Sequence, residues 1–316
     1  MSDDSDDVES LARDSLKQAL ATATTDIDSV LTEFGWREFV DSDESLAFTV
    51  LFEELGYLGA ETAALDHAIF TMLNRDSNER IVWPLGPGGD DTGSGVVSLD
   101  GVALRGGGLD AAAQVLAPVE GALRSVLVSS IHEAPLGGMA AGSAWVRVRI
   151  VGTPGVTLHP WDDVQRRASL ALASELVGVA QRIIDIAADQ VSTRHQFGRS
   201  IGTYQAVRFR LAESYVEIAG ARALIKSAWE DGSLAAATWS KTVAGIAHDV
   251  VAKHAIQVCG AIGLSQEHSL PALVRRGFAL AALLPTAPAT PAAIGSKLLA
   301  ASEDTDSSAP AAVGWF

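Results

Sequence analysis

The chain has 316 residues, of which 48% are hydrophobic, so it is long and apolar enough to bury a substantial core. Its formal net charge of -16 excludes a basic nucleic-acid binder, and the single cysteine, Cys259, excludes an internal disulfide or a cysteine cluster. The acidic N-terminus lacks the basic and apolar regions of a secretory signal, so we predict a cytoplasmic protein.

Residues 8–75 are predicted to form helices that pack in a core. Apolar residues recur there at helical spacing, first at Leu11, Leu16 and Leu20, then at Phe48, Leu51 and Leu55, and again at Leu65, Ile69 and Leu73. We expect an N-terminal helical domain over residues 1–78.

Residues 79–160 are predicted to form a middle β-domain. Short apolar runs at 96–99, 115–119 and 125–131 are separated by glycine, proline and aspartate. From Trp145 to Ile150, apolar residues alternate with Arg147 and Arg149, which is typical of a half-buried strand.

Residues 161–301 are predicted to form a C-terminal helical bundle, followed by a mobile tail at 302–316. Three apolar seams carry this prediction: Leu172, Leu176, Val179, Ile183 and Ile186; Val207, Leu211, Tyr215, Ile218 and Ile225; Trp239, Val243, Ile246 and Val250. Prolines at 285, 288 and 291 interrupt the uncharged stretch 277–295, so we predict no membrane span. The fold class is therefore mainly α with a small central β-domain.

Two segments at predicted helix junctions combine polar side chains with glycines. The first runs from Arg194 to Gln205 and contains Phe197 and Gly198, and the second is Gln257-Val258-Cys259-Gly260-Ala261-Ile262-Gly263. A guanidinium offers parallel donors to a diphosphate, and glycines let the backbone approach a ligand closely. The pattern predicts one wall of a nucleotide-cofactor site.

These segments resemble two motifs of the acyl-CoA dehydrogenases, Arg-x-x-Phe-Gly and Gln-x-x-Gly-Gly-x-Gly, and the order helical, β, helical also matches that family. The resemblance implies an acyl-CoA dehydrogenase-like fold and an FAD shared with a partner subunit. The cofactor-binding residues that it implies are Arg194 at the diphosphate, Phe197, Gln205, and a segment beside the adenosine half made of Gln257, Val258, Cys259, Gly260 and Ala261. Ala261 departs from the family's second glycine.

The family's catalytic glutamate has no counterpart at either of its usual positions. These fall on Ala168, beside Ser169, and on Leu284, beside Leu283 and Pro285. The nearest acids are Glu175 and Glu267, and the β-region also lacks the family's Gly-Ser-Asp flavin-facing segment. Without a positioned base the α-proton of the thioester cannot be removed, so we predict no catalytic residue in this chain.

The chain therefore resembles the base-lacking subunit of the paired acyl-CoA dehydrogenases of bacterial steroid side-chain degradation. That resemblance implies an α2β2 assembly with a homologous subunit that carries the catalytic glutamate, and an acyl-CoA substrate of the steroid side-chain class. Two alternatives stay open. One is a self-sufficient homo-oligomeric dehydrogenase, or related flavin monooxygenase, with a displaced base; the other is a flavin-free scaffold.

No metal site is predicted. His248 and His254 are six residues apart, a spacing that does not place them on one helix face, and no third ligand is evident.

Overall fold

The structure is a computed structural model, and it describes residues 2–22, 27–75, 79–86, 88–91, 95–104, 112–141, 143–285, 292 and 295–296. The predicted tail, 302–316, lies outside the described residues. The helices are α1 (Ser2–Thr22), α2 (Ile27–Phe34), α3 (Trp36–Ser42), α4 (Glu44–Leu58), α5 (Ala64–Met72), α6 (Trp161–Thr193), α7 (Gln205–Asp231), α8 (Leu234–Cys259) and α9 (Leu270–Ala282), with short 3-10 turns η1 (Gly138–Ala140), η2 (Ile201–Thr203) and η3 (Gly260–Leu264). The strands are β1 (Val82–Pro84), β2 (Asp90–Asp91), β3 (Val97–Ala103), β4 (Gln114–Val119), β5 (Ala122–Pro135), β6 (Val146–Pro160), β7 (His195–Gln196) and β8 (Arg199–Ser200).

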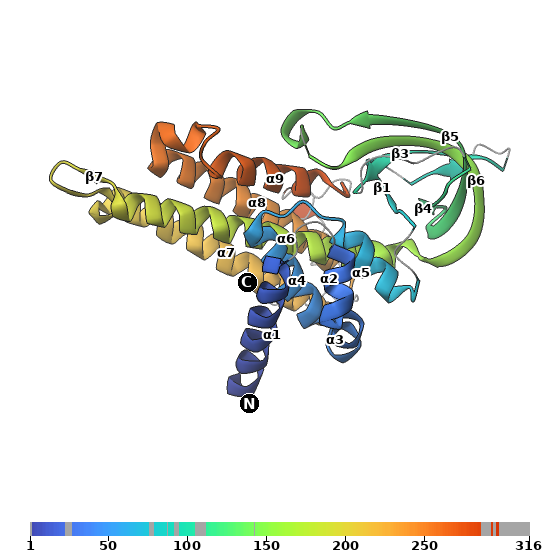
Figure 1. Cartoon of the computed structure of the whole chain (residues 1–316), viewed down its shortest axis with the longest axis horizontal. Coiled ribbons are helices and arrows are strands. Elements are labelled where there is room, and N and C mark those ends of the chain that lie inside the picture. Colours follow the sequence, from blue (N-terminus) through green and yellow to red (C-terminus); the bar gives the residue numbers. More distant parts are fainter. Residues whose placement is uncertain are drawn as a thin grey trace.

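The architecture confirms the predicted fold class. Helices α1 to α5 pack beside the middle of a long helical bundle, the sheet lies at one end of that bundle, and the β7–β8 hairpin extends from the other end (Figure 1). The division into domains at particular residues stays a prediction.

The sheet is antiparallel and has the strand order β1-β3-β6-β5-β4, with β2 paired to β3. The predicted strands are confirmed, including the alternation of buried apolar residues with exposed arginines that ends at Ile150. Val148 and Ile150 are buried, whereas Arg147 and Arg149 are exposed and both bind Asp100 on β3. The two arginines stabilise the Asp100 carboxylate and lower its pKa to about 2.

The three long helices α6, α7 and α8 are confirmed, and the seam of α6 is buried as predicted except at Ile186, which is half-buried. The core face of α8 was predicted wrongly. Ile246 is 40% exposed, and Trp239, Val243 and Val250 are only half-buried. Small side chains allow close packing against α6 and α7, so the apolar residues of the buried face are mostly alanine: Ala237, Ala244, Ala247, Val251, Ala252, Ala255, Val258 and Cys259.

Two other predicted core residues lie at the surface. Tyr215 on α7 is 59% exposed and Leu11 on α1 is 69% exposed, whereas Ile218 and Ile225 on α7 are buried. The exposure of Tyr215 shows that α7 has two apolar faces, one toward the bundle and one toward solvent.

Helices α4 and α6 cross through two glycines. A Cβ at Gly56 would lie 2.1 Å from the Glu175 carbonyl oxygen, and a Cβ at Gly178 would lie 2.0 Å from the Glu53 carbonyl oxygen. Only glycine permits this backbone contact, which fixes the N-terminal helices on the bundle.

Within the described residues, no helix combines the length and the apolar character that crossing a bilayer requires.

Candidate functional site: the end of the bundle at the β7–β8 hairpin

The first predicted segment forms a tight hairpin at the end of α6. Helix α6 ends at Thr193, and His195 and Gln196 then pair with Ser200 and Arg199. The two turn residues, Phe197 and Gly198, have φ values of 57° and 81°, as a type I′ turn requires. This backbone is costly for a phenylalanine, yet the ring is 91% exposed. The fold therefore holds an aromatic ring out into solvent at the end of the molecule.

The base of this hairpin is fixed by several contacts. The Ser200 hydroxyl donates to the Val191 carbonyl at 2.8 Å, and the Ile201 N–H donates to the Arg194 carbonyl at 2.9 Å. The Arg199 guanidinium lies 4.1 Å from the centre of the Tyr204 ring. These contacts hold the hairpin in one position at the end of α6.

The second predicted segment lies against the first. The Arg194 guanidinium donates from Nη1 to the Cys259 carbonyl at 3.5 Å, so the structure brings the two segments together. Helix α8 ends at Cys259, and Gly260 continues the chain with φ 69° and open space where its Cβ would be. Gln257 and Ala261 are exposed at this junction.

Val258 and Cys259 are placed differently from the other residues of this segment. Their side chains are 9% and 0% exposed, so only their backbone could contact a ligand. Burial raises the pKa of the Cys259 thiol, and Arg194 opposes that rise. The expectation that Gly263 lets a ligand approach is also corrected. A Cβ there would lie 2.9 Å from the Cys259 Cβ, so this glycine serves internal packing.

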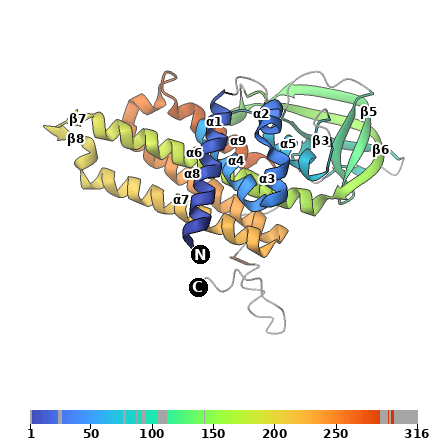
Figure 2. The same ribbon diagram turned by 60° about the horizontal axis from the view of Figure 1, so that its bottom comes forward.

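Gln205 is exposed at the first position of α7, at the same end of the bundle as the hairpin (Figure 2). Exposed residues continue along α7 at helical spacing in a row that we call the α7 outer stripe: Phe209, Ala212, Val216, Gly220 and Ala223. The sequence analysis missed this stripe. The sequence does contain a sign of the stripe. Phe209 and Val216 are seven residues apart, and they lie on a different face of the helix from the buried Ile218 and Ile225.

The two positions expected for a catalytic glutamate are buried and apolar. Ala168 is 0% exposed and Leu284 is 2% exposed. The Lys241 ammonium, which the sequence analysis also missed, donates to the carbonyls of Leu283 and Leu284 at 2.5 and 3.2 Å. Burial lowers the pKa of Lys241 to about 8. These hydrogen bonds fix the backbone at Leu283 and Leu284, and Lys241 is not an acid that could replace the glutamate.

The alternative acids, Glu175 and Glu267, lie in different surroundings. Glu175 is 5% exposed and accepts from Arg276 Nη2 at 2.5 Å, while Arg276 stacks 4.5 Å above the Trp145 ring. Burial raises the pKa of Glu175, and Arg276 opposes the rise. Glu267 is exposed in the turn before α9. Glu175 is thus engaged in an internal ion pair that joins α6 to α9, and Arg276 in turn contacts Trp145, just before β6.

Among the described residues, no group of three or more His, Cys, Asp or Glu side chains could hold a metal ion. His248 is fully buried between α8 and α9, where its ring meets Phe278 edge-on. Burial lowers the pKa of His248 to about 4. The imidazole is a neutral core side chain.

His248 makes the stability of the fold depend on pH. Its folded pKa lies below the ordinary 6.5, so protonation favours the unfolded chain, and stability that is complete above pH 6.5 declines as the pH falls toward 4. We expect this group to remove roughly 3 kcal/mol over that range. Urea titrations at several pH values should show a flatter dependence for His248→Leu than for the parent. Parallel curves for the two proteins would contradict this account.

With the geometry described, the class of protein can be stated. Residues 165–281 match the family "Acyl-CoA dehydrogenase, C-terminal domain", and the whole chain has the fold of acyl-CoA dehydrogenases. The C-terminal region of this chain is thus similar in sequence to the C-terminal domain of acyl-CoA dehydrogenases, and the chain has the fold of these enzymes.

Individual curated proteins are also similar to this chain in sequence. The chain is 34% identical over 133 residues to the acyl-CoA dehydrogenase IpdE2 of Mycolicibacterium smegmatis, a match that covers 42% of this chain and 43% of the relative. The chain thus spans less than half the length of the curated relatives that it matches.

Two solved structures share the fold over nearly their whole length. The ChsE4-ChsE5 complex from Mycobacterium tuberculosis has a TM-score of 0.67 and 20% identity, covering 95% of this chain and 98% of the other. A Tcur3481-Tcur3483 steroid ACAD variant has a TM-score of 0.64 and 21% identity, covering 96% and 99%.

Proposed function

We propose that this chain is the base-lacking partner subunit of a heteromeric FAD-dependent acyl-CoA dehydrogenase. It completes an FAD site that is held mainly by a homologous subunit carrying the catalytic glutamate. The observation that carries the proposal is a rigid, solvent-exposed wall at Arg194 and Phe197 in a chain whose Ala168 and Leu284 replace both expected acids.

The residues at the bundle end fit one wall of an FAD site. Arg194 supplies guanidinium donors for a diphosphate, Phe197 supplies an exposed aromatic face, and the open space at Gly260 lets the backbone approach a ligand. Gln205 and Gln257 add exposed amides. FAD, when bound, accepts the hydride from the acyl-CoA, and the residues of this chain bind and orient the cofactor.

The partner is proposed to cover the hairpin and the α7 outer stripe. Phe197 is 91% exposed, and Phe209 and Val216 are 57% and 67% exposed, so the described residues leave these apolar side chains uncovered. A similar structure is a complex of ChsE4 with ChsE5. By this likeness we propose a pair of homologous subunits in an α2β2 assembly.

The names of similar proteins support a proposal for the substrate class. The similar Tcur3481-Tcur3483 protein is described as a steroid ACAD, and IpdE2 is an acyl-CoA dehydrogenase. We therefore propose α,β-dehydrogenation of an acyl-CoA of the steroid side-chain class, in the cytoplasm, with the partner's carboxylate removing the α-proton.

Replacing Arg194 with alanine is expected to weaken FAD binding by the complex about 10- to 100-fold. The reason is that a charge-assisted hydrogen bond to a phosphate contributes roughly 1.5–3 kcal/mol. The chain would be co-expressed with a glutamate-bearing homologue, and the FAD content and dissociation constant of the purified complex measured by flavin absorbance. The matched control is Arg149→Ala, because Arg149 is an exposed arginine on the sheet that binds only Asp100 among the described residues.

Two results would decide against the proposal. If this chain, purified alone, binds FAD and oxidises an acyl-CoA, it is a self-sufficient homo-oligomeric flavoenzyme. If the co-purified complex never contains flavin, or if Arg194→Ala leaves its flavin content unchanged, the chain is a scaffold that keeps only the fold.

A further inference from the structure

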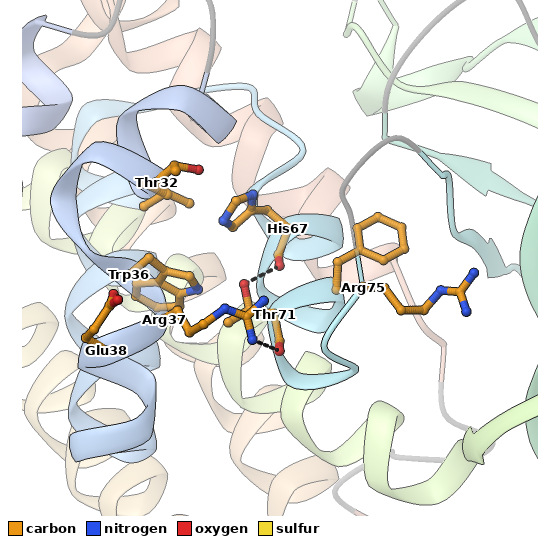
Figure 3. Close-up of a pocket in the computed structure, with 9 residues that line it drawn as sticks. Thr32, Trp36, Arg37, Glu38, His67, Thr71 and Arg75 are labelled. Carbon is orange, nitrogen blue, oxygen red and sulfur yellow. Dashed lines mark hydrogen bonds between the residues drawn. The ribbon is translucent and has the colours of Figure 1, made fainter.

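A pocket among the N-terminal helices contains none of the residues of the candidate cofactor site. It lies between α2, α3 and α5, has a volume of about 270 Å³, and is lined by residues that include Trp36, Arg37, His67 and Phe70 (Figure 3). A second hollow, which shares Arg37 and Thr71, continues from it along α3 toward Asn74. Helices α2, α3 and α5, which carry most of the pocket's lining, lie far from the β7–β8 hairpin at the end of the bundle (Figure 1).

The local sequence explains the shape of this pocket. Gly35 has a φ of 81°, a left-handed conformation that lets the chain turn sharply between α2 and α3. The turn brings Trp36 and Arg37, at the start of α3, opposite His67 on α5. The volume lies just below the roughly 300–1,000 Å³ of drug-sized sites, so a small ligand is the appropriate guest.

The charge of the pocket favours an anion. The Arg37 guanidinium donates from Nη1 to two neutral oxygens, Asn74 Oδ1 at 2.9 Å and the Thr71 carbonyl at 3.4 Å, and no carboxylate neutralises it in the described part of the chain. Glu38 also lines the pocket and, like Arg37, is exposed to solvent, and the second arginine, Arg75, donates to Glu79 at 2.6 Å. Arg37 therefore keeps free donors beside the pocket.

Two buried side chains supply further polar groups. Trp36 is 1% exposed, and its indole N–H has no hydrogen-bond partner among the described residues, which is costly for a buried donor. His67 is 9% exposed, and its Nδ1 lies 2.9 Å from the Asp28 carboxylate, which fixes the ring. Figure 3 shows the imidazole and the indole turned toward the same space.

Apolar side chains form another part of the wall, beside Thr32 and Thr71. Leu31 and Phe70 are buried and line the pocket together with the Trp36 ring. An arginine and an unpaired indole N–H beside aromatic and aliphatic surface match a carboxylate attached to a compact apolar body. We propose that this pocket binds a small organic carboxylate with an aromatic or aliphatic body.

The test compares phenylacetate with phenylacetamide, its neutral analogue. Binding would be measured by titration calorimetry on the full chain, in its complex if it requires one. We expect saturable binding of phenylacetate and at least ten-fold weaker binding of phenylacetamide, since the amide loses the charge that Arg37 recognises. Arg37→Gln should weaken phenylacetate binding by at least ten-fold, and Trp36→Phe, which removes the indole N–H together with part of the ring, by several-fold.

The matched control is Arg124→Gln, because Arg124 is a partly buried arginine on β5 that also donates to a backbone carbonyl, that of Gly155. It should leave the affinity unchanged, and circular dichroism should show that all three variants are folded. The proposal is overturned if phenylacetate does not bind, if acid and amide bind equally, or if Arg37→Gln binds as well as Arg124→Gln does.

Discussion

Replacing Gly178 with alanine is expected to lower the free energy of unfolding by about 3 kcal/mol or more. The new methyl group would meet the Glu53 carbonyl oxygen at 2.0 Å and the Tyr57 backbone nitrogen at 2.9 Å. Both atoms belong to the backbone of α4, so relief requires the two helices to separate and the surrounding core to open. Urea denaturation of the purified protein, followed by circular dichroism, would measure the loss.

The matched control is Gly245→Ala on α8. Its added methyl group would lie 3.6 Å from the Ala281 Cβ, which is an ordinary contact. Alanine is favoured over glycine inside a helix by up to about 1 kcal/mol, so this variant should be as stable as the parent or more stable. Equal effects of the two substitutions would show that the crossing of α4 and α6 is not as close as the structure describes.

The helices and strands were predicted well from the sequence, because apolar residues recur at a different spacing in a helix than in a strand. The spacing from Leu172 to Ile183 defines α6, and the alternation at Val148 and Ile150 defines β6. The prediction of the buried face of α8 failed, because the large apolar side chains of this helix were expected to form the core. Which face of a helix is buried depends on how closely its neighbours approach, and here alanine and glycine permit the close contact.

The candidate site was predicted in part. Two segments 65 residues apart were expected to share a wall, and the contact between Arg194 and the Cys259 carbonyl brings them together. The sequence could not distinguish Gln257, which is exposed, from Val258 and Cys259, which are buried, because that difference depends on how α8 is rotated in the bundle. The Lys241 contacts were equally hidden, since they join backbone carbonyls 42 and 43 residues away.

Replacing Arg276 with methionine is expected to cost about 3–5 kcal/mol of stability at pH 7. The substitution leaves the Glu175 carboxylate, 5% exposed, without the guanidinium that donates to it at 2.5 and 3.2 Å. An unpaired buried charge is far costlier than the loss of an exposed ion pair. The substitution would also remove the cation stacked on Trp145, and this stacking contact joins α9 to the residue just before β6.

The pH dependence and two further variants distinguish this charge effect from lost packing. Burial already raises the folded pKa of Glu175, and removing its cation raises it further, so the deficit should be largest at neutral pH and shrink as the pH falls toward the ordinary value near 4.5. Adding Glu175→Leu to Arg276→Met should recover most of the loss, because no buried charge remains. Lys253→Met breaks a pair with Asp249 whose side chains are 70% and 37% exposed, and should change stability by less than about 1 kcal/mol. A deficit that is independent of pH and persists in the double variant would assign the loss to packing around Trp145 instead.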